Sequence, residues 1–126
     1  MVSFEGLRLN SGSPIYRQIV LYLKKGIASG HIADGEELPS RRVLSALLGV
    51  NPNTVQKAFG ILEEEGMIRS HSGARSFVKA DSDVAGRIRM ELTLEQARAL
   101  ASSMKQMSVT REQTLELIDR VWGEEE

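Results

Sequence analysis

Residues 38–60 read LPSRRVLSALLGVNPNTVQKAFG, and this pattern predicts two short helices joined by a tight turn. Ser40 is suited to cap the first helix, because its hydroxyl can accept a hydrogen bond from an unpaired first-turn N–H. Gly49 fits the position after that helix, where a left-handed backbone is easiest without a Cβ. Asn51 followed by Pro52 then reads as the N-cap and first residue of the second helix.

Apolar residues in both helices recur at helical spacing, and we expect them to face a common core. They are Leu44, Leu47 and Leu48 in the first helix, and Val55, Ala58, Phe59 and Leu62 in the second.

The second stripe leaves a polar face near the start of the second helix, made of Asn53, Thr54, Gln56 and Lys57. These side chains suit base edges and phosphates, and the start of such a helix is where helix-turn-helix proteins contact DNA. An ordinary helical hairpin with a solvated polar face is the alternative at this point.

The residues that follow, MIRSHSGARSFVK at 67–79, predict a β-hairpin. One strand begins at Met67 and Ile68, the turn lies at residues 72–74, and Phe77 and Val78 form the returning strand. A helix-turn-helix followed directly by a hairpin is a winged helix. His71, Arg75 and Ser76 are expected at or near the wing tip, where such side chains can reach a groove or a phosphate.

An amphipathic helix is expected upstream, with Ser13 as N-cap, Pro14 as first residue and Gly30 as its end. Residues 1–12 would form an extended tail anchored by Phe4, Leu7 and Leu9. The predicted fold class is therefore α+β, mainly α. We expect residues 1–80 to form a winged helix-turn-helix DNA-binding domain and residues 81–126 to form a small C-terminal helical dimerisation module.

The run from Pro14 to Val78 resembles the GntR family of bacterial transcription regulators. The matching motifs are PIYRQI at 14–19, G-x-x-LPSRR at 35–42, LGVNPNTVQKAF at 48–59, L-x-x-x-G at 62–66 and G-x-x-x-FV at 73–78. The wording NPNTVQKA, with a short C-terminal remainder, is most similar to the YtrA subfamily.

This resemblance implies a dimeric DNA-binding repressor. The family's DNA contacts carry over onto Arg42, onto Pro52, Asn53, Thr54 and Gln56, and onto Gly73 in the wing. Many relatives have arginine at the positions of Pro52 and Gln56, which leaves the base preference open. From their charge, Arg41, Lys57 and Arg75 are predicted to contact phosphates.

Residues 84–122 are predicted to be helical and to dimerise the protein. Two stripes at different angles, together with the Thr93–Gln96 capping signature, predict a helix break near Thr93; a bent continuous helix is the alternative. Thr110 and Gln113 repeat the signature before a last helix. The predicted dimer residues are Val84, Ile88, Leu92, Leu100, Met104, Leu115, Ile118 and Trp122. The alternative is that these helices fold back on their own winged helix.

The composition of the chain favours some classes of function and argues against others. Residues 1–80 contain ten basic and seven acidic residues, and the remainder contains six and ten, which fits a DNA reader followed by an association module. The chain lacks cysteine and shows no catalytic or metal-ligand motif, so we expect no enzyme activity, cofactor or metal. No apolar run is long enough to span a membrane, and we expect a cytoplasmic protein.

The sequence therefore predicts a regulator, most simply a repressor, that binds double-stranded DNA at an inverted repeat as a homodimer. A winged-helix protein-interaction module is the alternative. The 46 residues after residue 80 are too few for a ligand-binding domain of the usual size. An effector is not identified: a small ligand between the C-terminal helices, a partner protein and operator occupancy alone stay open.

Overall fold

The computed structural model describes residues 1–71 and 75–124. Its elements in chain order are α1 (Ile15–Ser29), β1 (Glu37–Leu38), α2 (Arg41–Leu48), α3 (Pro52–Glu64), β2 (Ile68–Ser70), β3 (Ser76–Val78), α4 (Ser82–Gln106) and α5 (Arg111–Val121). The chain divides into two compact units, Met1–Arg89 and Met90–Glu126. The functional boundary expected after residue 80 stays a prediction.

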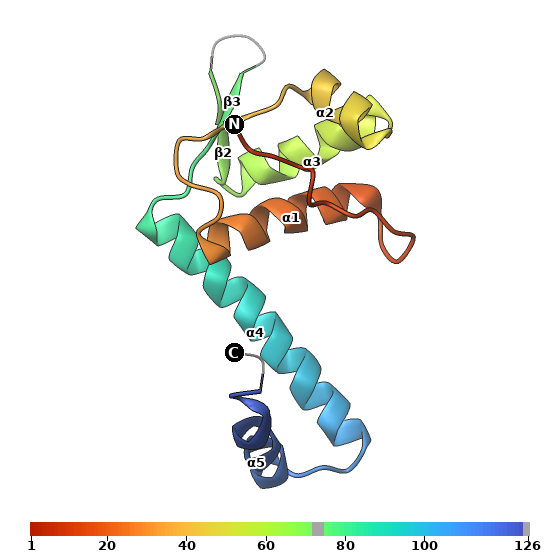
Figure 1. Cartoon of the computed structure of the whole chain (residues 1–126), viewed down its shortest axis with the longest axis vertical. Helices are drawn as coiled ribbons and strands as arrows, with labels where there is room; N and C mark the ends of the chain where they lie inside the picture. Colours follow the sequence, from red (N-terminus) through yellow and green to blue (C-terminus); the bar gives the residue numbers. More distant parts are fainter. Residues whose placement is uncertain (72–74, 125–126) are drawn as a thin grey trace. The chain divides into compact units, whose positions relative to one another are not determined.

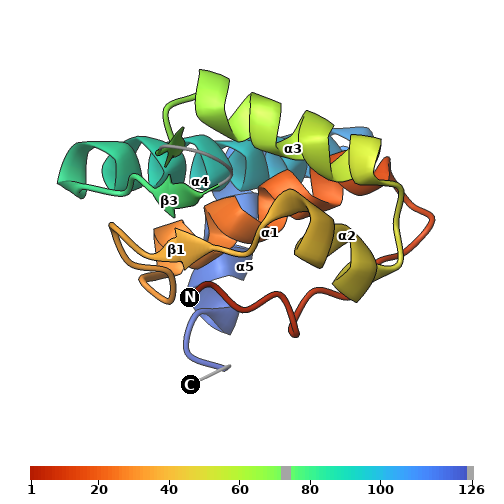
Figure 2. The same ribbon diagram turned by 90° about the horizontal axis from the view of Figure 1, so that it is seen from above.

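The first unit is a winged helix. Helix α3 packs against α1 and α2, and a small sheet lies beside the helices (Figures 1 and 2). The sheet is antiparallel with strand order β1-β3-β2. The hairpin of β2 and β3 was predicted from the sequence. The third strand was not, because β1 is only two residues long and is defined by its pairing with β3, in which Glu37 lies opposite Phe77.

The core of this unit confirms the predicted stripe of α3, whose four apolar side chains are all buried. In α2, Leu44 is buried as expected, but the prediction for Leu47 is wrong, since 60% of that residue is exposed. Helix α2 is only eight residues long and buries a narrow stripe. At 100° per residue, Ser45 falls on that stripe and Leu47 outside it. The Ser45 hydroxyl is satisfied by donating to the Arg42 carbonyl over 2.9 Å.

The predicted boundaries of the helix-turn-helix are confirmed. Ser40 Oγ accepts from Val43 N–H over 3.1 Å, and Asn51 Oδ1 accepts from Asn53 N–H over 2.8 Å. Gly49 ends α2 with φ of 68°, a left-handed conformation that glycine adopts without strain. Upstream, Pro14 rather than Ser13 is the N-cap residue of α1, and no side chain caps that helix.

The helix break predicted near Thr93 is wrong: α4 runs without interruption from Ser82 to Gln106. The Thr93 hydroxyl donates to the Met90 carbonyl over 3.3 Å, one turn earlier, as hydroxyls inside helices do. The capping box predicted at Thr110 and Gln113 is confirmed at the start of α5, with both of its hydrogen bonds present.

The first turns of α4 belong to the winged-helix unit. Val84 and Ile88 are buried there, and two arginines of the same segment donate to backbone carbonyls near the ends of other helices. Arg87 Nη2 reaches the Glu65 carbonyl at 2.9 Å, and Arg89 Nη2 reaches the Ala28 carbonyl at 3.2 Å. These contacts fasten α4 to the C-terminal ends of α3 and α1.

The N-terminal residues are also part of this unit. Val2 and Phe4 are buried, and Val2 N–H donates to the Glu37 carbonyl over 2.9 Å. The Tyr22 hydroxyl donates to the Ser3 carbonyl over 2.8 Å. Phe4 anchors the tail as expected, whereas Leu7 and Leu9 are only half-buried and a turn interrupts the tail at residues 5–6.

Candidate nucleic-acid interface

The N-terminal turns of α3 gather most of the predicted base-contacting residues on one open face. Pro52, Asn53 and Gln56 are exposed and Thr54 is half-buried. The opposite face of the helix carries its buried stripe, so the polar face is turned away from the core. Pro52, Asn53 and Gln56 are therefore open to a binding partner, and Thr54 is partly so. A face of this composition can donate to and accept from base edges.

The start of α2 adds two arginines with different roles. Arg42 is exposed and available to a base or a phosphate. Arg41 is half-buried, and its guanidinium carbon lies 4.9 Å from the centre of the Phe59 ring. Its Nε is buried without a hydrogen-bond partner among the described residues. Arg41 therefore packs α2 onto α3, a role that its charge did not reveal.

The wing arginine is held by an ion pair. Arg75 Nε and Nη2 donate to the two carboxylate oxygens of Glu37, each over 3.1 Å. These hydrogen bonds lower the pKa of Glu37 and raise that of Arg75. The ring of His71 meets Phe77 edge-on at 5.5 Å. Gly73, predicted to contact DNA, lies outside the described residues.

A second group of polar side chains joins α1 to α3. Lys57 Nζ lies 4.1 Å from the centre of the Tyr16 ring, and Arg17 Nε donates to the Tyr16 hydroxyl over 3.2 Å. The hydrogen bond from Arg17, followed by the charges of Arg17 and Lys57, lowers the pKa of Tyr16. Lys57, predicted from the sequence, is thereby linked to two residues that were not among the predicted contacts.

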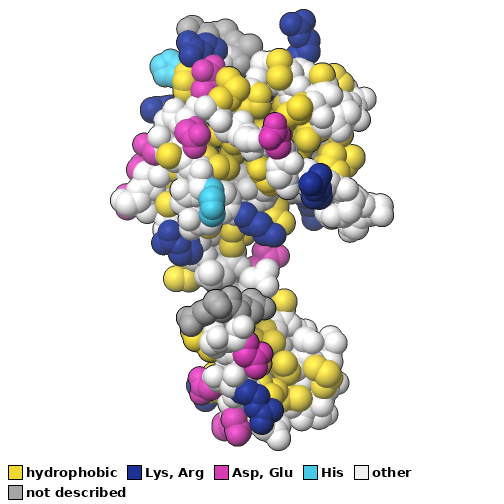
Figure 3. All heavy atoms as spheres, viewed as in Figure 1, with side chains coloured by type: hydrophobic (Ala, Val, Ile, Leu, Met, Phe, Trp, Pro, Cys, Tyr) yellow, Lys and Arg dark blue, Asp and Glu magenta, His cyan; other side chains and the backbone are white. Residues whose placement is uncertain are grey.

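Sequence reasoning did not identify Glu37 as part of the wing. Its role depends on pairing between β1 and β3, which no local pattern indicates, whereas Tyr16 and Arg17 lie within the PIYRQI motif that carried the family resemblance. In the space-filling view, Lys and Arg side chains lie over α2 and beside the wing strands (Figure 3). The first unit therefore presents cations on the elements that would meet DNA.

The predicted dimer residues fall into two groups. Val84 and Ile88 are 8% and 2% exposed and lie in the core of the winged-helix unit. Leu92, Leu100, Met104 and Ile118 are half-buried, and Leu115 and Trp122 are 45% and 79% exposed. None of the described residues from 90 to 124 is buried.

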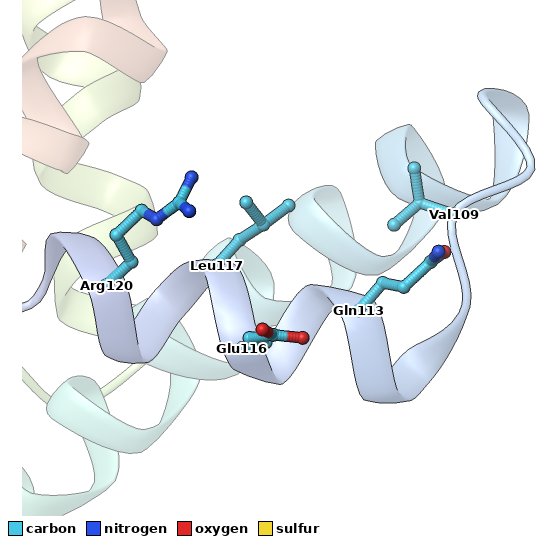
Figure 4. A pocket seen from close by; sticks show the side chains of 5 residues that line it. All are labelled: Val109, Gln113, Glu116, Leu117 and Arg120. Atoms are coloured by element: carbon cyan, nitrogen blue, oxygen red, sulfur yellow. The ribbon is translucent and has the colours of Figure 1, made fainter.

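The second unit also has hollowed apolar surfaces. One hollow of about 360 Å³ is lined by Val109, Gln113, Glu116, Leu117 and Arg120. Figure 4 shows the side chains of Leu117 and Arg120 on the same side of α5 as Val109. A second hollow of about 320 Å³ lies between the end of α4 and the start of α5, with Met104, Val109 and Leu115 in its lining.

The described residues offer little for other kinds of site. No helix among them combines the length and hydropathy needed to cross a bilayer. Within the same residues, no cluster of three or more histidine or carboxylate side chains is arranged to hold a metal ion.

Comparison with known proteins gives a consistent result. The profile of the family described as "Bacterial regulatory proteins, gntR family" matches residues 15–78. The chain is 28% identical over 109 residues to an uncharacterized HTH-type transcriptional regulator, YhcF of Bacillus subtilis, covering 86% of this chain and 90% of that protein. It is 38% identical over 72 residues to the HTH-type transcriptional repressor YtrA of the same organism, covering 57% and 55%.

The fold has a counterpart among solved structures. A GntR family transcriptional regulator from Listeria monocytogenes superposes with a TM-score of 0.80 and 27% sequence identity. The match covers 90% of this chain and 99% of the Listeria chain, so it includes helices beyond the winged helix.

Proposed function

The chain belongs to the GntR family of bacterial regulatory proteins and is a YtrA-like transcriptional regulator with a DNA-binding domain, not an enzyme; from this premise we propose that it is a cytoplasmic repressor that binds an inverted-repeat operator as a homodimer. The observation that carries the proposal is the exposed polar start of α3, backed by a buried apolar stripe. The relative YtrA is named a repressor, which supports the direction of regulation.

In this proposal α3 enters the major groove and reads the operator. Asn53, Thr54 and Gln56 contact base edges, since amide and hydroxyl groups match their donors and acceptors. Pro52 offers an apolar contact to a thymine methyl, and Arg42 reaches a guanine or a phosphate. Lys57 contacts a phosphate, which positions the helix without specifying sequence.

The wing contributes the remaining contacts, for which the sequence predicts His71, Gly73 and Arg75. The ion pair limits how Arg75 can bind DNA, because its guanidinium already binds both carboxylate oxygens of Glu37. A phosphate must replace that carboxylate or share the guanidinium with it. Arg75 is therefore expected to contribute less to affinity than Arg42.

Dimerisation is supported by the unsatisfied apolar surface of the second unit. Large apolar side chains are exposed on both of its helices, among them Met90, Leu94, Leu115, Leu117 and Trp122, and Figure 3 shows hydrophobic surface gathered on this unit. Exposed apolar patches mark association sites, and a second copy is the most economical partner.

The lining of the hollow beside Val109 and Leu117 fits a contact related by a two-fold axis. Glu116 and Arg120 stand one helical turn apart beside Leu117. In an isologous interface, Glu116 of one protomer can face Arg120 of the other, and the same pair forms twice. A homodimer on an inverted repeat would bring its two α3 helices into successive major grooves about 34 Å apart.

DNA binding is tested by fluorescence anisotropy with duplexes from the DNA upstream of the protein's own gene. We expect Arg42→Ala and Asn53→Ala each to weaken binding to the selected operator by about 1–3 kcal/mol. Lys25→Ala is the matched control, because it removes an exposed cation from the middle of α1. If both face variants bound the operator as tightly as the wild type, the assigned reading face would be wrong.

The dimer is tested by sedimentation equilibrium at micromolar concentration. The wild type is expected to sediment as a dimer. Leu117→Asp should shift it toward monomer, since the introduced charge cannot be buried without a partner. Lys25→Asp introduces the same carboxylate on α1 as a control. A wild-type monomer under these conditions would refute the dimer.

A further inference from the structure

Three side chains from two helices meet in the first unit without a carboxylate among them. Tyr16 and Arg17 lie at the start of α1, and Lys57 lies in α3, 40 residues or more further along the chain. Lys57 Nζ is 4.1 Å from the Tyr16 ring centre and the Arg17 guanidinium carbon is 5.8 Å from it. The fold therefore brings two cations against one phenol.

This arrangement differs from two ion pairs of the same unit. Lys24 is paired with Glu65 at 3.0 Å, and Arg75 is paired with Glu37. Within residues 1–71 and 75–124, neither Arg17 nor Lys57 forms an ion pair with a carboxylate. Two unneutralised cations that share one ring repel each other, and an anion placed between them would relieve that repulsion.

The phenol is oriented to take part in binding such an anion. The Tyr16 oxygen accepts a hydrogen bond from Arg17 Nε, which leaves its own O–H free to donate. The same hydrogen bond and the two nearby charges lower the pKa of this hydroxyl, so it is a stronger donor than an isolated tyrosine. The start of α1 adds no competing negative charge, because its first turn has neither an acidic residue nor a side-chain cap.

We propose that Tyr16, Arg17 and Lys57 together bind one backbone phosphate of the DNA duplex. This proposal rests on the proposed function, because Lys57 stands one turn after Asn53 on the exposed side of α3. When the start of α3 lies in the groove, Lys57 faces the bordering strand, and α1 extends the contact along that strand. The site contributes affinity and register but no sequence preference.

The first test measures operator affinity as a function of salt for three variants. Tyr16→Phe keeps the ring under Lys57 and removes one donor, so we expect a loss of about three- to tenfold with an unchanged salt slope. Arg17→Gln removes a phosphate-bound charge and should reduce the salt slope by about one. Lys25→Gln removes an equal charge elsewhere on α1 and should change neither affinity nor slope appreciably. Thermal unfolding by circular dichroism verifies that each variant is folded.

The second test locates the phosphate. Single phosphates in the operator are replaced by neutral methylphosphonates, one position at a time in each half-site. In the wild type, one position beside the site of α3 should weaken binding, and the same replacement should cause little further loss in Arg17→Gln. This non-additivity is the signature of a direct contact.

The outcomes separate this site from the function on which it rests. If the wild type does not bind duplex DNA at all, the proposed function fails and this site fails with it. If the wild type binds and Asn53→Ala weakens it, while Tyr16→Phe and Arg17→Gln match the wild type in affinity and slope, the phosphate site alone is overturned. Losses that are additive at every methylphosphonate position would also overturn it.

Discussion

Replacing Asn51 by aspartate should separate the stability of α3 from its affinity for DNA. Asn51 Oδ1 accepts a 2.8 Å hydrogen bond from Asn53 N–H. An aspartate oxygen can make the same bond and also interacts favourably with the positive end of the helix. We expect Asn51→Asp to keep the free energy of unfolding or raise it by about 0.5 kcal/mol. Asn51→Ala, which removes the acceptor, should lower it by about 1 kcal/mol.

The affinity for DNA should change in the opposite order. In the proposed complex the start of α3 faces the duplex, so the new carboxylate approaches the phosphates. Two unit charges about 4 Å apart in water repel by about 1 kcal/mol, which corresponds to roughly fivefold weaker binding at low salt. Added salt should reduce the loss by screening. Asn51→Ala carries no charge, and its folded molecules should bind almost as the wild type does.

Urea denaturation followed by circular dichroism gives the free energies of unfolding, and fluorescence anisotropy with the operator at two salt concentrations gives the affinities. Equal stability loss in both variants would show that the cap bond does not stabilise α3. Unchanged affinity of Asn51→Asp at low salt would show that the start of α3 does not approach a phosphate.

Three further predictions concern stability, each measured by denaturation. Leu44→Ala should lower the free energy of unfolding by about 2–5 kcal/mol, whereas Leu47→Ala, at a largely exposed position, should change it by about 0.5 kcal/mol or less. Gly49→Ala should cost about 1 kcal/mol through its φ of 68° alone, since no atom lies within 4 Å of an added Cβ. Arg75 lowers the pKa of Glu37, so the pair stabilises the fold at pH values above 4.5, the ordinary pKa of this carboxyl group. The stabilisation is lost as the pH falls through the lowered pKa. Glu37→Gln should therefore destabilise the fold at neutral pH but not in acid.

The elements of the helix-turn-helix could be predicted because their signals are local. Ser40, Gly49 and Asn51 each define a helix end within a few residues of their own position, so the helix ends could be recognised from neighbouring residues in the sequence. The capping box at Thr110 belongs to the same class. The same signature at Thr93 led to a wrong prediction. A capping side chain stabilises a helix start only where the preceding backbone is extended, and residues near Thr93 do not show whether it is.

The remaining features depend on contacts between distant residues. Strand β1 exists through its pairing with β3, and the engagement of Arg75 by Glu37 follows from that pairing. Arg41 was identified by charge, but the position of Phe59 determines where its guanidinium lies. The meeting of Tyr16 with Lys57 likewise requires α1 and α3 to pack together. Residue type indicated which side chains could act, and tertiary packing determined which are free to do so.

The hydrogen bond between Val2 and Glu37 protects an edge of the sheet from association with other molecules. Strand β1 is one of the two outer strands of its sheet, and the Val2 amide donates to the Glu37 carbonyl on the outer side of that strand. Uncovered outer strands invite edge-to-edge aggregation between molecules. A truncation that removes residues 2–4 would take away this amide together with the buried Val2 and Phe4, and it would expose the edge.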